Sequence, residues 1–231
     1  MVVNPTGTVA IISAWNESRR LGAVVRGARR HLPVLVVDDG STDETAAVAA
    51  SEGAEVLRHI RNLGKGAALR SGFAWVLERD YAAALTLDAD GQHDPDEIPR
   101  FLEASGSGAD LVIGRRDFSR MPFPRGQSNA FGSWILSRAL RYPIQDNQCG
   151  FRWHRRRLVQ ALHLTRRGFE LEVEVIIQAV CGGFRVEWVP VRTIYDTGKA
   201  SYFHPVGDSL RFLGMVIHAA QVRSAVGRGR R

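Results

Sequence analysis

An α/β fold, with a mostly parallel Rossmann-like sheet and helices on both faces, is predicted for this chain of 231 residues. Short apolar runs typical of buried strands alternate with longer segments of helical periodicity through the first half of the sequence. Such alternation requires crossover helices that cover both faces of a parallel sheet. With 45% hydrophobic residues, the chain can bury the core that one such domain needs.

The elements of the first half are expected in a regular order. The strands are Val9 to Ser13, Val34 to Asp39, Glu55 to His59, Ala83 to Leu87 and Asp110 to Gly114. The helices cover Glu17 to His31, an Ala-rich segment ending near Ser51, Lys65 to Arg79, and a segment that starts at Pro95. Ser41 or Thr42 is the expected N-cap of the Ala-rich helix, because their short hydroxyl side chains accept hydrogen bonds from backbone amides.

The second half is less regular. We expect a helix from Ser128 to Leu140, a turn from Asp146 to Gly150, a helix from Glu170 to Val180 and a strand from Arg185 to Ile194. The last segment, Val206 to Val226, is predicted to be an amphipathic helix. Its apolar face would carry Leu210, Leu213, Met215, Val216, Ile217 and Ala220. Residues 1–204 are expected to form one domain, with the helix and basic tail of 205–231 packed on it.

Composition excludes several classes of protein. The longest apolar runs, such as Val34 to Val37, are far shorter than the roughly 20 residues of a membrane-spanning helix. The first residues carry neither a basic region nor a long apolar region, so a cytoplasmic location is expected, with peripheral contact at the inner face of the membrane as an option. The two cysteines, Cys149 and Cys181, have no metal-binding spacing and are expected to be reduced thiols.

The net charge of +7 points to an anionic partner. The excess gathers in Arg115 and Arg116, in Arg152 to Arg157, in Arg166 and Arg167, and in the tail from Arg228 to Arg231. Nucleic acid, phospholipid headgroups and a phosphorylated substrate all satisfy this charge.

Acidic residues end two of the predicted strands, Asp38-Asp39 and Asp88-Ala89-Asp90. Ligands of parallel α/β sheets bind beyond the carboxyl ends of the strands, so we expect the four acids to converge there on one cation and a pyrophosphate. An isolated Asp-x-Asp is usually an acidic turn, but the buried strand before Asp88 favours a site. The oxygens of Asp88, Asp90 and Gln92 suit Mg²⁺ or Mn²⁺, which would neutralise a leaving diphosphate.

Two further segments fit a nucleotide site. Asp38 and Asp39 can accept hydrogen bonds from a base or a ribose. In the segment Asn62 to Gly66, glycines permit close approach of another backbone, and Lys65 can face a phosphate or a neighbouring carboxylate. The segment lacks the spacing of a Walker motif, which disfavours a P-loop NTPase.

Several ordered motifs together resemble the family 2 glycosyltransferases, near the branch of dolichol- and polyprenyl-phosphate sugar synthases. The likeness runs from about Val9 to Tyr195. It implies a nucleotide-sugar glycosyltransferase A-type fold and metal-dependent transfer of a sugar with inversion. Ser13 stands where the family usually has proline. The matching segments are Ala14 to Glu17, Val36 to Thr45, Asn62 to Gly66, Leu87 to Pro95, Gly114 to Arg116, and Asp146 to Arg152.

The resemblance also implies roles for single residues. Asn16 and Glu17 would lie beside the nucleotide, with Asp39 on the base or ribose. Asp146 would lie near the acceptor as a general base, or would orient groups if the acceptor is already a phosphate. The metal ligands would be Asp88, Asp90 and Gln92, and the candidates for the acceptor phosphate are Arg116, Arg125, Lys199 and Ser201.

Several functions stay open on sequence alone. The donor would be a GDP- or UDP-sugar, and the acceptor polyprenyl phosphate reached at a membrane face or a soluble molecule. A sugar nucleotidyltransferase would use similar acids and release pyrophosphate instead of a nucleoside diphosphate. A non-catalytic scaffold would not need the central acids. A basic nucleic-acid-binding module would explain the arginines but not the acidic strand ends, which repel phosphates. The oligomeric state is not indicated.

Overall fold

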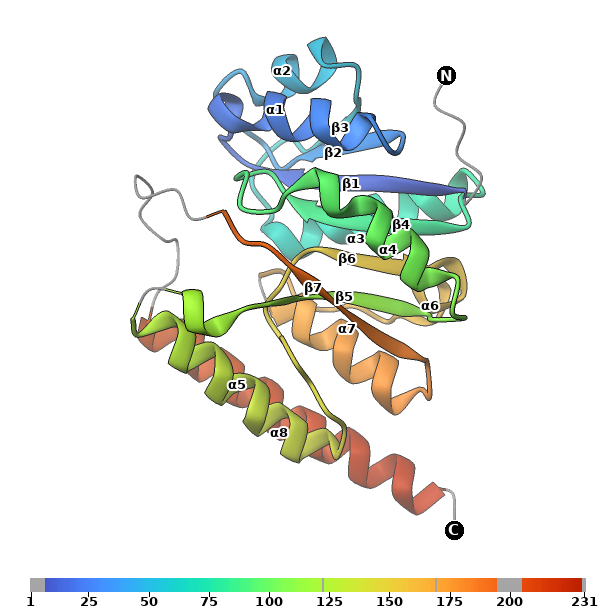
Figure 1. Cartoon of the computed structure of the whole chain (residues 1–231), viewed down its shortest axis with the longest axis vertical. Helices are drawn as coiled ribbons and strands as arrows, with labels where there is room; N and C mark the ends of the chain where they lie inside the picture. Colours follow the sequence, from blue (N-terminus) through green and yellow to red (C-terminus); the bar gives the residue numbers. More distant parts are fainter. Residues whose placement is uncertain (1–6, 122, 169, 195–204, 230–231) are drawn as a thin grey trace.

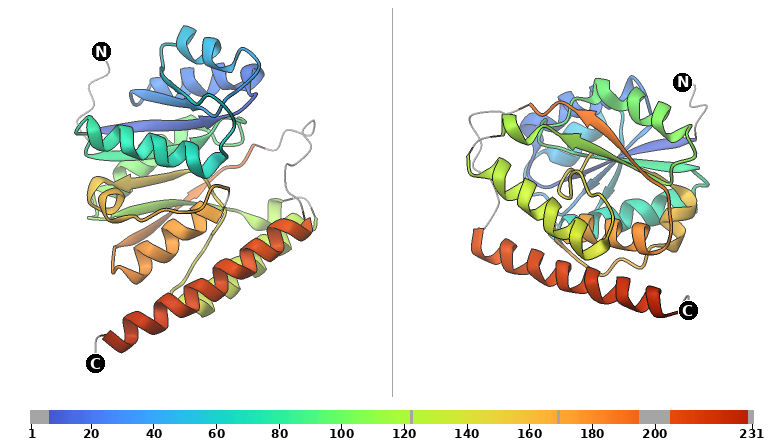
Figure 2. Two further views of the ribbon diagram at one scale, coloured as in Figure 1. Left: turned by 180° about the vertical axis from the view of Figure 1, so that it is seen from behind. Right: turned by 60° about the horizontal axis from the view of Figure 1, so that its bottom comes forward.

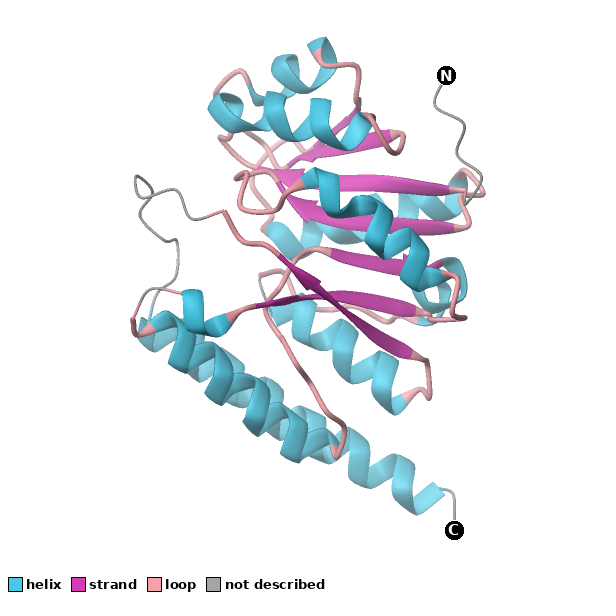
Figure 3. Cartoon of the chain, viewed as in Figure 1, coloured by secondary structure: helices cyan, strands magenta, loops and turns pink. Residues whose placement is uncertain are grey.

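One seven-stranded sheet in the order β3-β2-β1-β4-β6-β5-β7 forms the centre of the molecule (Figures 1 and 3). The computed structural model describes residues 7–121, 123–168, 170–194 and 205–229, except for the side chains of 205–211 and 226–229. Only β6 runs antiparallel to its neighbours, β4 and β5, within this sheet. The strands are β1 (Thr8–Ala14), β2 (Val34–Asp38), β3 (Glu55–Arg58), β4 (Ala83–Asp88), β5 (Leu111–Arg116), β6 (Arg152–Arg155) and β7 (Val186–Val191).

Helices cover both faces of the sheet, so the predicted fold class is confirmed (Figure 2). α3 packs on β1 and β2 beside α6 and α7, whereas α1 and α4 lie on the other face. The central strands β1, β2 and β4 are buried almost throughout, as expected of parallel strands covered on both sides. The helices are α1 (Ser18–Arg29), α2 (Thr45–Ser51), α3 (Lys65–Glu78), α4 (Ile98–Ser105), α5 (Arg125–Leu140), α6 (Arg156–Ala161), α7 (Glu170–Cys181) and α8 (Pro205–Gly229), with short 3₁₀ turns η1 (Pro95–Glu97) and η2 (Phe118–Arg120).

The predicted N-cap of α2 is wrong. The helix begins at Thr45, and the side chain of Asp43 accepts the hydrogen bond from the Thr45 amide at 3.0 Å. A carboxylate is a strong acceptor at a helix N-terminus, where the helix dipole also favours negative charge. Ser41 serves a different purpose, because its hydroxyl accepts from the amide of Asn16 at 2.9 Å.

The polar strand β6 was missed, since its sequence Arg-Trp-His-Arg has no apolar run. Arg152 lies at the centre of the sheet with 1% exposure. Its guanidinium donates to the carbonyl oxygens of Cys149 at 2.6 Å, Glu172 at 2.5 Å and Asn147 at 3.2 Å. Backbone acceptors therefore compensate for the burial of this charge.

The fold itself binds most of the basic run from Arg152 to Arg157, one of the places where the positive charge gathers in the sequence. Arg155 donates to the Ala109 carbonyl at 2.8 Å, and Arg156 donates to the Leu77 carbonyl at 2.9 Å. Arg157 pairs with the buried carboxylate of Asp110 at 2.7 Å. These cations join β6 and α6 to the rest of the fold and are not gathered on one open face.

α8 lies beside α5 and also contacts α7, forming a two-helix layer below the sheet in Figure 1. The apolar face predicted for this helix is wrong: Met215 is buried, but Leu213 and Ile217 are 51% and 53% exposed. The packed face is instead built from Phe212, Met215, Ala219 and Val222. The side chain of Leu210 lies outside the described residues. Within the part of the chain that is described, no helix is both long and apolar enough to cross a bilayer.

Candidate active site

The predicted acids do end neighbouring strands at one edge of the sheet. In the β1–β2 register, Asp38 lies opposite Ala14, and in the β1–β4 register Asp88 lies opposite Ser13. The carboxyl ends of β2 and β4 therefore flank the end of β1, which continues into Asn16 and Glu17. This edge is where ligands of parallel α/β sheets bind.

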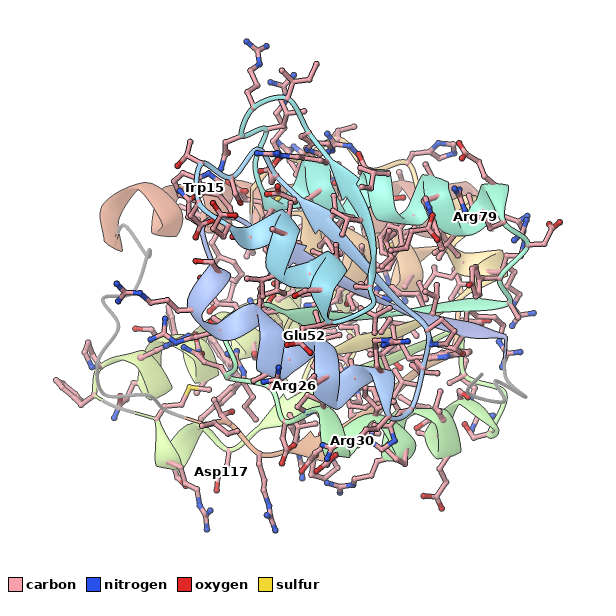
Figure 4. All side chains as sticks on the ribbon, turned by 90° about the horizontal axis from the view of Figure 1, so that it is seen from above. Trp15, Arg26, Arg30, Glu52, Arg79 and Asp117 are labelled. Atoms are coloured by element: carbon pink, nitrogen blue, oxygen red, sulfur yellow. The ribbon has the colours of Figure 1, made fainter. Side chains whose placement is uncertain are left out.

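The segment after β1 is fixed to the segment after β2. Asn16 adopts a left-handed conformation with φ of 53°, which asparagine tolerates better than most residues. Its side-chain oxygen accepts from the amide of Thr42 at 2.9 Å, while the Glu17 amide donates to the Thr45 hydroxyl at 2.9 Å. Both predicted nucleotide-side residues thus sit in one cross-linked loop pair. Beside them Trp15, labelled in Figure 4, is 43% exposed.

Asp38 is fully buried and bound by the chain itself. Its Oδ1 accepts from the Ser41 amide at 2.9 Å, and its Oδ2 lies 3.1 Å from Nε of Arg58. Gly40, which precedes Ser41, has φ of 72°, and a Cβ there would lie 2.3 Å from the carbonyl carbon of Arg61. Glycine is required at this close approach. Asp38 therefore shapes the edge of the site.

Asp39 holds the loop that leads to α3. Its Oδ1 accepts from the Leu63 amide at 3.0 Å and lies 2.7 Å from Nδ1 of His59, while its Oδ2 accepts from the Gly64 amide at 2.7 Å. The other ring nitrogen of His59 lies 2.9 Å from the hydroxyl of Ser71. The role of Asp39 at a base or ribose stays a prediction; the structure shows it ordering the loop that would border the nucleotide.

Lys65 joins two acids from distant parts of the sequence. Its Nζ lies 2.6 Å from Oδ1 of Asp88 and 2.7 Å from Oε1 of Glu172. Burial alone would lower the pKa of Lys65, but the two carboxylates outweigh it and raise that pKa. Burial would raise the pKa of Asp88, and Lys65 together with His93, at 3.2 Å, lowers it instead. Both groups are therefore charged.

The structure shows Lys65 facing a carboxylate, one of the two kinds of partner expected for it. The adjacent Gly66 amide donates to the carbonyl of Arg167 at 2.7 Å, so the glycines of this segment admit the chain's own backbone. Glu172 and His93 were missed as members of the site. Glu172 reads as one of three alternating acids at the start of a helix, and nothing in its sequence neighbourhood points to Lys65.

Gly150 brings the turn after Asp146 against these acids. A Cβ at this position would lie 2.8 Å from Oδ2 of Asp88 and 3.0 Å from Oε1 of Glu172. The Gly150 carbonyl accepts from the hydroxyl of Thr86 on β4 at 2.9 Å. A larger residue would push directly on both carboxylates, so the turn and the end of β4 form one packed unit.

Asp146, at the other end of this turn, is completely buried and pairs with Arg116. The guanidinium donates in bidentate fashion, Nε to Oδ2 at 2.7 Å and Nη2 to Oδ1 at 2.9 Å. The amides of Arg116, Gln148 and Cys149 donate to the same carboxylate at 3.2, 3.0 and 3.1 Å. With five donors on it, Asp146 orients Arg116 and closes the turn in this conformation. Its role as a general base stays a prediction.

Asp88 and Asp90 offer the chemistry of a divalent-metal site. Their carboxylate oxygens are the ligands that Mg²⁺ and Mn²⁺ prefer, and the side chain of Asp88 is 28% exposed at the strand end. Lys65 already places positive charge on Asp88. Gln92 donates its backbone amide to Oδ1 of Asp90 at 3.0 Å, which closes the acidic turn. Two carboxylates fit an ion whose remaining ligands come from water and substrate phosphate.

The expectation that all four acids converge on one cation is not met. Asp38 and Asp39 are directed to Arg58 and to His59 and the loop amides. Among the described residues, no three histidine, cysteine, aspartate or glutamate side chains come together as a metal site. The two acidic strand ends thus differ in their partners, although they share one edge.

Of the remaining candidates, the structure describes Arg125 and Gln92. Arg125 is exposed at the first position of α5. Gln92 is bonded to the end of the sheet, because its carbonyl accepts from the amide of Ile194 at 3.0 Å. Lys199 and Ser201 lie outside the described residues.

Two other features of the described residues, a surface hollow and the cysteines, are already satisfied by the chain itself. A shallow hollow of about 440 Å³ is lined by residues of α1 and of the end of α2, among them Arg26, Arg30 and Glu52 (Figure 4). Its arginines are already bonded: Arg26 pairs with Glu52, and Arg30 lies 2.6 Å from Asp96. Both cysteines are free thiols, and burial beside Asp146 raises the pKa of Cys149 to about 12, which makes it unreactive.

The fold and the acidic edge together define a glycosyltransferase of the A-type fold. Among solved structures, glucosyl-3-phosphoglycerate synthase from Mycobacterium tuberculosis in complex with phosphoglyceric acid superposes with a TM-score of 0.74 at 18% identity, covering 93% of this chain and 80% of that one. The same enzyme in complex with Mn²⁺, UDP and glucosyl-3-phosphoglycerate gives a TM-score of 0.72 at 18% identity, covering 94% and 79%. At this identity the likeness shows the fold.

The chain belongs to glycosyl transferase family 2, whose profile matches residues 9–163. A polyprenol monophosphomannose synthase of Mycolicibacterium smegmatis is 32% identical over 211 residues, covering 82% of this chain and 78% of the relative. An undecaprenyl-phosphate mannosyltransferase of Micrococcus luteus is 33% identical over 199 residues, covering 79% and 82%. The family and branch predicted from the sequence motifs are confirmed, and the protein is a glycosyltransferase.

Proposed function

We propose that this glycosyltransferase moves a sugar from a nucleotide-sugar donor to a polyprenyl phosphate, with a divalent metal ion and with inversion at the anomeric carbon. The observation that carries the proposal is the pair Asp88 and Asp90 at the carboxyl end of β4, beside the half-buried Lys65. The names of the two relatives supply the acceptor class, and mannose is the first sugar to test.

On the donor side, Asp88 and Asp90 would hold the ion, with Gln92 as a further candidate. When bound, Mg²⁺ or Mn²⁺ would supply positive charge to the departing nucleoside diphosphate. Asn16, Glu17, Asp38 and Asp39 would border the nucleotide through the cross-linked loops after β1 and β2. The Mn²⁺ and UDP in the solved neighbour support a divalent ion and a nucleoside diphosphate in this fold.

On the acceptor side, Arg116 is the favoured contact for the phosphate. Asp146 engages Nε and Nη2 of the guanidinium, which leaves Nη1 for an acceptor oxygen. Arginine suits phosphate because its planar fork gives directed hydrogen bonds. Arg125, Lys199 and Ser201 are additional candidates.

The reaction exchanges one bond for another at the anomeric carbon. An oxygen of the acceptor phosphate attacks as the bond to the donor diphosphate breaks, and the bonding pair leaves with the diphosphate. A phosphate acceptor is already anionic, so it needs little deprotonation. Orientation of Arg116 by Asp146 is accordingly the proposed function of this acid, and proton removal by Asp146 is the alternative.

A transfer assay tests the proposal. Purified protein is incubated with labelled GDP-mannose, UDP-glucose or UDP-galactose, in Mn²⁺, Mg²⁺ or EDTA, with undecaprenyl phosphate in detergent. We expect label in the organic phase from one donor, only with metal. Label delivered solely to soluble acceptors such as 3-phosphoglycerate would replace the lipid acceptor. Pyrophosphate release from a nucleoside triphosphate and a sugar phosphate would instead identify a nucleotidyltransferase.

A further inference from the structure

An aromatic stripe runs along the outward side of α5. Gln127, Phe131, Trp134 and Arg138 follow one another at spacings of four, three and four residues, which places them on one helical face, and all four are exposed. Phe131 and Trp134 are 60% and 59% exposed, and their rings stack with centroids 5.9 Å apart. Adjacent exposed aromatic side chains on a surface helix indicate an interaction surface, whereas single scattered ones are common and need no explanation.

The stripe is separate from the face by which α5 joins the protein. Leu136 and Leu140 of α5 are fully buried, and Ser133 is 4% exposed. Gly132 faces α8, since a Cβ on it would lie 3.4 Å from the ring of Phe212. Phe131 and Trp134 therefore add nothing to the core, and no fold requirement accounts for two aromatics in these positions.

The helix that carries the stripe is basic. No aspartate or glutamate occurs between Arg125 and Arg141, and Arg125, Arg138 and Arg141 are all exposed. Phe123, just before the helix, is 83% exposed. On the neighbouring α8, the apolar side chains of Leu213 and Ile217 are each about half exposed. Among the described side chains, five of the nine exposed large hydrophobic residues thus lie in or beside these two helices.

We propose that the outward stripe of α5, from Gln127 to Arg138, docks the protein on an anionic lipid surface. Phe131 and Trp134 would enter the boundary between headgroups and acyl chains, and the arginines would contact anionic headgroups. The proposal deepens the proposed function, because a polyprenyl phosphate is presented at such a surface.

A lipid surface fits better than a second copy of the chain. In a two-fold dimer built on this stripe, arginines and no acids would face arginines and no acids, so the charges would repel. Anionic headgroups give the opposite sign of charge. Docking also places the N-terminal end of α5, which follows the Arg116 end of β5, close to the surface (Figure 1).

Vesicle co-sedimentation tests the docking without any acceptor or donor. The probes are vesicles of phosphatidylcholine alone and of phosphatidylcholine with phosphatidylglycerol. We expect binding to the anionic vesicles, weakened by salt, and a loss on the order of tenfold in partition coefficient for the double variant Phe131→Ser/Trp134→Ser. The matched control is Ile60→Ser, which removes a fully exposed apolar side chain from a distant loop and should bind like the wild type.

The design separates this inference from the proposed function. Near-ultraviolet circular dichroism would check that the double variant is folded, and we expect its transfer of sugar to a detergent-dispersed acceptor to remain. If the wild type binds anionic vesicles but transfers no sugar to polyprenyl phosphate, the docking proposal is kept and the proposal of a polyprenyl phosphate acceptor is rejected. Unchanged vesicle binding by the double variant, no binding by the wild type, or a dimer in sedimentation velocity that the variant abolishes would overturn the docking.

Discussion

Two acid–cation pairs lie on either side of the same site, and they differ in how completely the protein satisfies them. Asp146 accepts five hydrogen bonds from Arg116 and the backbone and has no exposure. Asp88 meets Lys65 and His93 with a side chain that is 28% exposed. A carboxylate saturated by its own chain stabilises the fold, whereas a partly exposed carboxylate with fewer partners keeps oxygen lone pairs that a ligand can use.

The region of β5 and β6 should therefore respond to substitution mainly in stability. For Asp146→Ala we expect a loss of about 3–5 kcal/mol in the free energy of unfolding, because the buried Arg116 loses its partner. Urea denaturation measures it. The isosteric Asp146→Asn is the control. If this variant has near-native stability but has lost transfer, and the rate no longer depends on pH, Asp146 acts as a base and its role is not mainly structural.

The β4 end should respond in activity instead. Asp88→Asn and Asp90→Asn are expected to lower transfer by about 100-fold or more, since a metal ion supplies several kcal/mol of charge stabilisation. The loss of unfolding free energy should stay smaller than that of Asp146→Ala, because Lys65 keeps Glu172 as a partner. The matched control, Asp94→Asn in the same segment, should transfer like the wild type. Full activity of Asp90→Asn at saturating Mn²⁺ would remove the metal assignment.

The pH dependence of the free energy of unfolding tests whether the buried polar residues of β6 stabilise the fold. Burial lowers the pKa of His154 to about 3. The folded protein therefore keeps this ring neutral between about pH 6.5 and 3, while the unfolded chain protonates it, so stability falls as pH falls through that window. The slope from this group is at most about 1.4 kcal/mol per pH unit. His154→Phe should flatten the profile by that amount in urea titrations, and an unchanged slope would contradict it.

The smallest expected effect concerns competition at Asp88. Lys65→Met removes the ammonium 2.6 Å from Oδ1 of Asp88, so Mn²⁺ would no longer have to displace it. We expect the apparent affinity for Mn²⁺ alone to rise a few-fold in calorimetry. Lys65→Arg, which keeps the charge, should not show the increase. A fall in affinity in both variants would mean that Lys65 supports the ion instead of competing with it.

The parts of the fold that could be predicted are the elements whose hydrophobicity pattern reflects their burial. β1, β2 and β4 are buried on both faces, so each has an apolar sequence that predicts a strand. The predicted ends of β2 and β4 in turn placed Asp38, Asp39, Asp88 and Asp90 at one edge of the sheet. β6 could not be found, because Arg152 and His154 are buried by virtue of backbone acceptors and packing that only the fold provides.

Partners of single side chains were equally out of reach. Lys65 meets Glu172, and Arg116 meets Asp146, through approaches between elements far apart in the chain. The prediction of which face of α8 packs on the protein was also wrong, because the packed face depends on the positions of α5 and α7. The resemblance to a family predicted the class of reaction. It did not distinguish Asp38, whose carboxylate is bound by the chain itself, from Asp88, whose carboxylate is partly exposed and can still bind a ligand.

Thermal melting with nucleotide is the most direct test of metal-dependent donor binding at Asp88 and Asp90. UDP and GDP, each with Mn²⁺ or with EDTA, are added to the wild type and to Asp90→Asn. At 100 times its dissociation constant, a ligand of the folded state stabilises by about 2.7 kcal/mol. We predict a rise in melting temperature for one nucleotide, only with Mn²⁺ and only in the wild type. An equal rise in EDTA, or in Asp90→Asn, would contradict the account.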